Sequence, residues 1–343
     1  MKNLFLLFTL LLVLTGCVNP TLTPEAWQDR TLERVWPLPP DSPRIKLVRM
    51  LSDDSSLGQV GRGERLLDWL TGGREDAGGL ISPHAVAADG DGRIWVTDAG
   101  LSGVHLFDLA RQNISFFGGS ASHPMMLPLG VAYDRVHDRV YVSDALAAQV
   151  YAFESDGDPL VTWRLDKSFE RPVGLSVDAN GRLYVADALS GVVEVFSAEG
   201  RSFLTLDSAG SEYGAMNRPV AVAVDHQGYA FVVDSFGFRV LIFDREGHPI
   251  GSIAHLGDSP GSLARPRGVA VDSQGHVYVS DAAFDNIQIF DMAGNTLLFF
   301  GGGGSGPGLF SLPAGLAFDR EDRLYVVDAQ NKRVQVFQYL PRL

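Results

Sequence analysis

Six copies of one pattern follow each other from residue 83 to residue 337, and this repeat limits the folds that the chain can adopt. Each copy starts near a proline, and these prolines are Pro83, Pro128, Pro172, Pro219, Pro266 and Pro313. Each copy also has a Val-x-Asp triplet, and the triplets end at Asp98, Asp144, Asp187, Asp234, Asp281 and Asp328. Two markers that stay in phase over six copies cannot arise by chance, so we expect six equivalent structural units.

The copies have the pattern of short β-strands separated by tight turns. In the fifth copy, residues 268–272, 277–281, 287–290 and 297–300 are strand-like runs, rich in β-branched and aromatic residues. Glycine is frequent, with 38 of 343 residues, which suits a fold with many turns. Four antiparallel strands per repeat of this length are typical of a β-propeller blade. The sequence therefore predicts an all-β fold, a single six-bladed β-propeller over residues 45–343.

The two ends of the chain supply complementary parts of one blade. The sixth copy stops after its third strand, at residues 335–337, and therefore lacks a fourth strand. A strand-like run at residues 45–51 precedes the first copy. We expect this run to complete the last blade and close the ring, because the pairing would remove an open sheet edge.

The consensus of the copies resembles the NHL repeat. It reads Pro-x-Gly-Val-Ala-Val-Asp-x-x-Gly-x-Val-Tyr-Val-x-Asp, and the resemblance covers residues 83–337. The copies differ from the family mainly after Val-x-Asp, where the family often has Asn-x-Arg and only the sixth copy keeps it, at residues 331–333. The resemblance implies a six-bladed propeller. Propellers of this kind include metal-dependent lactonases and lyases, and some NHL proteins bind RNA, so the fold leaves the function open.

The first residues have the features of an export signal. Residues 1–16 contain Lys2 and then an apolar run over residues 4–14, which is too short to span a bilayer but matches a signal-peptide core. The tetrapeptide Leu-Thr-Gly-Cys that ends at Cys17 resembles the lipobox of bacterial lipoproteins, which implies a diacylglycerol on the Cys17 thiol. The alternative is a secretory signal followed by an incidental thiol. Cys17 is the only cysteine, so an intramolecular disulfide is excluded.

Two segments before the first copy carry further expectations. Residues 17–44 hold six prolines and predict a semi-rigid tether behind the lipid. By analogy with the sorting rule for such lipoproteins, Val18 implies an anchor in the outer membrane of a Gram-negative host, facing the periplasm. Residues 52–82 form an insertion, in which leucines at positions 66, 67 and 70 have helical spacing. This short helix would act as a lid or docking element, or simply pack on the propeller.

A binding or catalytic residue should depart from the repeat, because one site needs one copy of each group. The repeating aspartates are therefore expected to cap turns rather than to form a metal site. The loops before the prolines and those after Val-x-Asp should share one face of the ring, where basic residues recur. The candidate ligand-binding residues are His84, His123, Arg171, Arg218, Arg265 and Arg267. They would bind an anionic partner; the alternative is that each arginine pairs with an aspartate of a neighbouring blade.

The net charge of −13 disfavours nucleic acid as a partner, because binding a phosphate backbone requires clustered cations. No catalytic residue, metal ligand or cofactor is predicted, since the histidines do not form a set that converges on one point. The sequence favours a lipid-anchored binding or scaffold protein of the cell envelope, which presents one propeller face to a protein, a peptide or a small anionic ligand. It would contact the membrane through its lipid alone. The alternative is a metalloenzyme of the lyase or lactonase type, with a metal in the channel.

Overall fold

The computed structural model describes residues 28–29, 31–57, 78–119 and 124–340. Its regular structure consists of β-strands and, among these residues, one short 3-10 helix, η2 (Asp54–Leu57). No helix in the described ranges has the length and hydrophobicity needed to cross a bilayer. Cys17, the predicted signal peptide and the helix expected around residues 66–70 lie outside the described residues.

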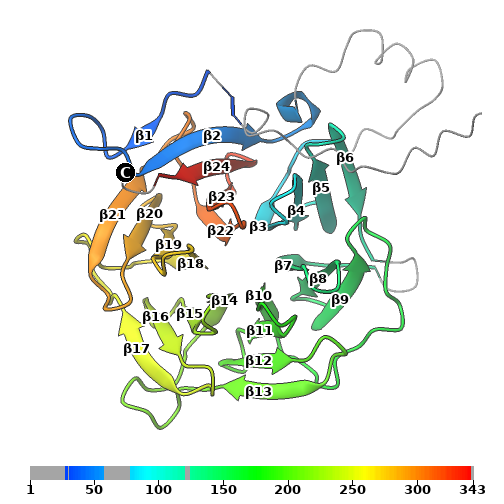
Figure 1. Ribbon diagram of the computed structural model, residues 1–343. Coiled ribbons are helices and arrows are strands. Elements are labelled where there is room, and N and C mark those ends of the chain that lie inside the picture. Colours follow the sequence, from blue (N-terminus) through cyan, green and yellow to red (C-terminus); the bar gives the residue numbers. More distant parts are fainter. Residues whose placement is uncertain (1–27, 30, 58–77, 120–123, 341–343) are drawn as a thin grey trace, which may run out of the picture.

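Six antiparallel sheets surround a central axis, which confirms the predicted six-bladed propeller (Figure 1). The first blade contains β3 (Pro83–Ala88), β4 (Arg93–Asp98), β5 (Gly103–Asp108) and β6 (Asn113–Phe117). The third blade contains β10 (Pro172–Val177), β11 (Leu183–Asp187), β12 (Val192–Phe196) and β13 (Ser202–Leu206). The fourth blade contains β14 (Pro219–Val224), β15 (Ala230–Asp234), β16 (Arg239–Phe243) and β17 (Pro249–Ile253). The fifth blade contains β18 (Pro266–Val271), β19 (Val277–Asp281), β20 (Asn286–Phe290) and β21 (Thr296–Gly301).

The second blade departs from this plan because only three of its segments form strands. They are β7 (Pro128–Asp134), β8 (Arg139–Asp144) and β9 (Gln149–Glu154). In place of a fourth strand, the chain after β9 returns along it with one bridge, between Phe153 and Pro159. Two backbone hydrogen bonds join it to β9, from the Leu160 N–H to the Ala152 carbonyl and from the Glu154 N–H to the Asp158 carbonyl. The following chain turns away at Trp163, whose N–H bonds back to the Leu160 carbonyl.

The predicted closure of the ring is confirmed. The sixth blade contains β22 (Pro313–Phe318), β23 (Arg323–Asp328), β24 (Arg333–Tyr339) and then β2 (Ile45–Leu51) from the other end of the chain. β2 runs antiparallel to β24, with Ile45 opposite Tyr339 and Leu51 opposite Val334. A fifth strand, β1 (Val35–Trp36), pairs with the outside of β2. The last part of the predicted tether therefore lies against the propeller.

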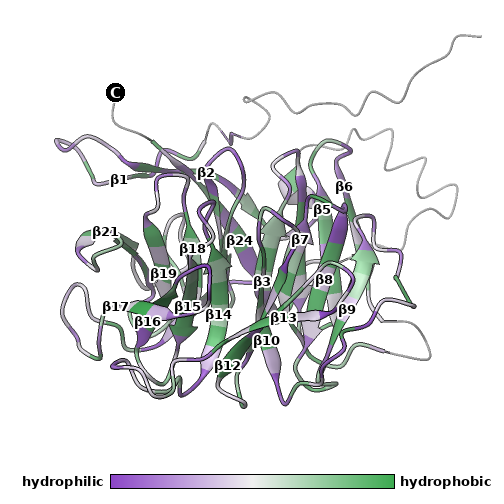
Figure 2. Cartoon of the chain, turned by 60° about the horizontal axis from the view of Figure 1, so that its bottom comes forward, coloured by the Kyte–Doolittle hydropathy of each residue, from purple (hydrophilic) through white to green (hydrophobic). Residues whose placement is uncertain are grey.

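The hydrophobic core lies between neighbouring blades. Buried residues of the first blade, such as Trp95 and Val104, pack in one cluster with Val131 and Phe153 of the second blade. Figure 2 shows apolar residues along much of the strands and polar residues mainly in the turns at their ends. Each blade therefore buries its apolar surface against the next blade, and the ring as a whole is needed to cover it.

The repeating aspartates cap turns, as predicted. The carboxylate of Asp144 accepts hydrogen bonds from the N–H groups of Met126 and Leu127, before β7, and from those of Leu146 and Ala147, after β8. The other five aspartates of the Val-x-Asp triplets bond the equivalent loops. The loops before the inner strands and those after the second strands therefore share one face of the ring, which we call the mouth face.

Small residues at the third position of the inner strands let neighbouring blades approach each other closely. The position is occupied by Ala85, Gly130, Gly174, Ala221, Gly268 and Gly315. A Cβ atom added to Gly174 would lie 2.5 Å from the Cα atom of Ala221 in the next blade. A Cβ atom added to Gly315 would lie 2.7 Å from the Cα atom of Ala85, across the boundary between the sixth and first blades. Real Cβ atoms do not come this close to backbone, so glycine is required at both positions.

We expect Gly174→Ala to destabilise the propeller by about 1–3 kcal/mol, because the added methyl group meets backbone that can move only by separating two blades. Urea unfolding at equilibrium would measure the loss. Gly306→Ala is the matched control, since its Cβ would meet only the Leu309 side chain, at 3.7 Å. The control should change the unfolding free energy by less than about 0.5 kcal/mol. Equal stability of the two variants would contradict this account of the glycine.

Candidate functional site

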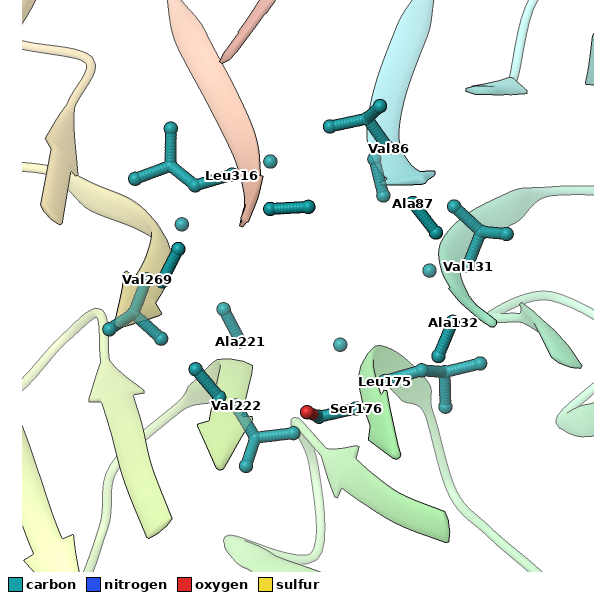
Figure 3. Close-up of a pocket in the computed structure, with 18 of the residues that line it drawn as sticks. Val86, Ala87, Val131, Ala132, Leu175, Ser176, Ala221, Val222, Val269 and Leu316 are labelled. Atoms are coloured by element: carbon teal, nitrogen blue, oxygen red, sulfur yellow. The ribbon is translucent and has the colours of Figure 1, made fainter. Parts of the chain in front are cut away.

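A narrow channel runs along the axis of the ring, enclosed by the six inner strands. It has a volume of about 220 Å³. Figure 3 shows the wall of this channel, where apolar side chains such as Val86, Val131 and Val269 surround the opening and the Ser176 hydroxyl is the labelled polar group. Free backbone groups of the inner strands also face the channel, so its exposed surface is polar as well as apolar. Among the residues that line it, His84 and Arg267 are those whose side chains can carry a positive charge, so chemistry that requires such a charge must lie at the end of the channel where they meet.

The mouth of the channel is where the repeat is broken. The second residue of each inner strand lies there, and these residues are His84, Leu129, Val173, Val220, Arg267 and Ala314. The structure brings the two polar members together: an Nη2 of Arg267 lies 3.0 Å from Nε2 of His84, although 183 residues separate them in the sequence. They come from the fifth and first blades, which flank the sixth.

The hydrogen bonds of His84 define its protonation state. Its Nδ1 lies 2.9 Å from the carbonyl oxygen of Leu129 in the second blade, and a carbonyl can only accept. Nδ1 therefore carries the proton. Nε2 then accepts from the Arg267 guanidinium, which can only donate. The imidazole is neutral, and it links three blades at the mouth.

The electrostatics agree with this assignment. Burial and the positive charge of Arg267 lower the pKa of His84 to about 4. Burial, and then the charge of Arg265, also lower the pKa of the Arg267 guanidinium. Both shifts have one physical meaning: the positive charge of Arg267 is partly removed from water, with a second cation nearby and no carboxylate of the described residues paired with it.

The predicted pairing of the arginines with aspartates of neighbouring blades is absent from the described part of the chain. The candidate arginines are Arg171, Arg218, Arg265 and Arg267, and no ion pair joins any of them to a described carboxylate. Arg218 instead places its guanidinium 4.9 Å from the ring centre of Phe236. Arg171, Arg218 and Arg265 occupy equivalent positions before the inner strands of three consecutive blades, at the rim of the mouth. His123 lies outside the described residues.

The backbone carbonyl of Leu129 is the member of the site that sequence reasoning missed. Leucine at this position carries no polar side chain, so the sequence gives no signal of its role. The channel lining contains a single imidazole, that of His84, and both of its ring nitrogens already have partners. Among the described residues, no group of three or more His, Cys, Asp or Glu side chains is placed to hold a metal ion.

A family model of the NHL repeat matches residues 263–290 and 310–337, which are the fifth and sixth copies. No curated protein sequence matches the chain. The family model thus recognises two of the six copies, and the structure shows that all six copies form blades of one propeller.

Solved propeller structures share the fold at low sequence identity. A virginiamycin B lyase from Staphylococcus aureus has a TM-score of 0.55 at 10% identity, over 76% of this chain and 95% of that one. A gluconolactonase from Xanthomonas campestris has a TM-score of 0.56 at 16% identity, over 76% and 87%. An auxiliary nutrient binding protein from Bacteroides thetaiotaomicron has a TM-score of 0.55 at 14% identity, over 76% and 69%. At these identities the likeness shows the fold alone.

The pKa of His84 gives a pH-dependent stability that can be measured. Because this pKa is about 4 in the folded protein and 6.5 in model peptides, the unfolded chain binds the proton more readily at intermediate pH. Stability should therefore fall as the pH is lowered from 6.5 toward 4, by about 3 kcal/mol in total. Urea unfolding at pH 7 and pH 4.5 should show a smaller loss for His84→Gln than for the unaltered chain.

The same assignment can be tested by an NMR titration of the His84 imidazole. Arg267→Met should raise the His84 pKa, because the arginine charge is one of the two causes of its depression. An unchanged pKa in this variant would show that the two side chains do not interact in solution.

Proposed function

The chain is an NHL-repeat six-bladed β-propeller, and we propose that it is a binding protein whose mouth face receives a negatively charged group of a protein, peptide or small molecule. One observation carries the proposal. Arg267 lies at the mouth with its guanidinium partly buried, bonded to a neutral imidazole and without a carboxylate partner among the described residues. A bound anion would supply the missing countercharge.

The geometry suits a carboxylate or a similar oxyanion. A guanidinium presents several N–H donors in one plane, and one Arg267 nitrogen is already bonded to His84, which holds the group in place. Arg265 adds a second positive charge close by, as its effect on the pKa of Arg267 shows. The chain has a net charge of −13, but these cations produce a local positive potential at the mouth. An acidic ligand would therefore be attracted to the mouth rather than to the rest of the surface.

The channel beneath the mouth limits the size of what can enter. Its volume of about 220 Å³ admits a group of roughly the size of a benzene ring, so a larger ligand must remain largely outside, on the mouth face. The structural relatives comprise a lyase, a lactonase and a nutrient binding protein. Among the described residues that line the channel there is no free imidazole or carboxylate, which favours binding over catalysis for this chain.

We further propose that the protein acts in the bacterial cell envelope as a lipoprotein. The support is the sequence alone: a signal-like segment over residues 1–16, then Cys17 as the lipidated residue and Val18 as the outer-membrane sorting signal. The binding face would then be presented to the periplasm on a membrane anchor.

Arg267→Met should weaken the binding of citrate, used here as a polycarboxylate probe, by at least tenfold in isothermal titration calorimetry. The loss of charge-assisted hydrogen bonds is the physical reason. Arg245→Met is the control: Arg245 lies in a turn on the opposite face, beside Gly228, and its substitution removes the same charge. Citrate binding that is equal in both variants, or that is lost in both, would contradict a site at the mouth.

Cys17→Ser should abolish incorporation of an alkyne-labelled fatty acid into the protein when it is expressed in a Gram-negative host. The reason is that the thioether to diacylglycerol can form only on the thiol. The label would be read by gel fluorescence, with Ser55→Ala as an unrelated substitution that should retain it. Fatty-acid label that persists in Cys17→Ser would overturn the lipoprotein proposal.

A further inference from the structure

Large apolar side chains are exposed together on the mouth face. Four of them follow the Val-x-Asp triplets of the first four blades, and the fifth, Met126, precedes the inner strand β7. We call the five residues the apolar arc: Leu101, Met126, Leu146, Leu189 and Phe236. Each is between 42% and 62% exposed. On the opposite face, Val136 and Met292 are exposed in separate turns, of the second and fifth blades. The mouth face differs because its exposed apolar side chains come from consecutive blades and lie beside the arginines.

The capping aspartates place the arc beside the arginines. The N–H groups of Leu189 and Arg171 bond to the same carboxylate, that of Asp187, so the two residues lie on either side of it. In the fourth blade the contact is direct, since the Arg218 guanidinium lies 4.9 Å from the ring centre of Phe236. Apolar and cationic groups are thus neighbours in the third and fourth blades.

The positions after Val-x-Asp differ between blades. In the fifth and sixth blades the positions equivalent to Leu189 and Phe236 are Ala283 and Gln330, which present little apolar surface. The exposed leucines near these blades, Leu256 and Leu309, lie in the loops before their inner strands. Arg267 and Arg265 lie on the fifth blade, next to the end of the arc at Phe236. A ligand that covers the arc and reaches Arg267 would therefore cross the mouth from the first four blades to the fifth.

We infer that the mouth face docks an acidic segment of a partner protein, in which apolar side chains flank a carboxylate. This inference rests on the proposed anion site and names the occupant of the same face. The apolar neighbours would cover the arc, where exposed leucine and phenylalanine gain most from leaving water, while the carboxylate would lie at Arg267. We expect the partner segment to be negatively charged, because the candidate arginines have no carboxylate partners among the described residues and interfaces pair surfaces of opposite potential.

Two other occupants fit the observations less well. A second copy of this chain would bring the same arginines of both copies together across a symmetric interface. A lipid surface with anionic headgroups would have to attract a chain whose net charge is −13. Both occupants make distinct predictions and can be excluded in the same experiment.

The test uses the full chain and a fluorescent peptide, Leu-Asp-Phe-Asp-Leu-Asp-Phe. One comparison peptide replaces each aspartate with asparagine, and another replaces each apolar residue with serine. Fluorescence anisotropy should show binding of the first peptide at least tenfold tighter than of either comparison peptide. Equal binding of all three peptides would overturn the inference.

The matched variants separate the arc from the anion site. The double variant Leu189→Ser/Phe236→Ser should weaken peptide binding at least tenfold and leave citrate binding unchanged. The control is Phe203→Ser/Leu297→Ser, on outer strands of the ring, where Phe203 is similarly exposed and also has an arginine, Arg182, 4.9 Å from its ring centre. The control should bind both probes normally.

The outcomes distinguish the two proposals. Unchanged peptide binding in the arc variant, with citrate binding still lost in Arg267→Met, would overturn the docking inference and leave the anion site intact. Unchanged citrate binding in Arg267→Met would overturn the anion site itself. Binding of Cys17→Ser protein to phosphatidylglycerol vesicles that is lost when Leu189→Ser/Phe236→Ser is added would replace the peptide by a membrane as the occupant. A dimer in analytical ultracentrifugation that is lost in the same double variant would replace it by a second copy of the chain.

Discussion

The close approach of six inner strands around one axis is the constraint on which the rest of the molecule depends. Glycine or alanine at the third position allows this approach, and hydroxyl groups fix it. The Ser280 hydroxyl accepts from the Gly268 N–H at 2.8 Å and donates to the Ala314 carbonyl of the next blade at 2.7 Å. Thr97 and Ser143 make the same link in the first two blades. In these three blades the middle residue of Val-x-Asp thereby bonds one blade to its neighbour; in the other three it is alanine or valine.

This constraint also determines where charge can be placed. Small residues in the wall leave a narrow channel, and a charged side chain there would lose much of its hydration without a countercharge among the lining residues. The second residue of each inner strand lies at the mouth, where polar and charged side chains are tolerated because they can contact solvent. Substitution at just two of the six equivalent positions, His84 and Arg267, is therefore enough to create a polar site on an otherwise regular ring.

The repeat predicts the fold almost completely, because equivalent residues occupy equivalent positions and pack in the same way in every blade. It also predicts that β2 completes the last blade, since a missing strand and a spare strand can be counted in the sequence. The repeat predicts four strands in each blade, and the second blade has three. Its fourth strand is missing because the chain after β9 follows that strand only briefly before it turns away. For the site, departure from the repeat identifies His84 and Arg267, but their contact depends on ring geometry that no local pattern contains. The alternative, that the candidate arginines pair with aspartates of neighbouring blades, is not seen among the described residues. The carboxylates of the Val-x-Asp triplets bond loop N–H groups, as at Asp187, and where one of them pairs with an arginine, that arginine belongs to the same blade, as in Asp234–Arg239 and Asp328–Arg333.

The pairing of β2 with β24 has a consequence for the order of events during biosynthesis. β2 must wait without its partner until β24 has been made, because Ile45 pairs with Tyr339 across the junction. Until then the growing assembly has two unsatisfied strand edges, which are sites for aggregation or exchange between molecules. Loss of β24 would leave the edges of β2 and β23 unpaired, so the ring can close only after this strand has been made.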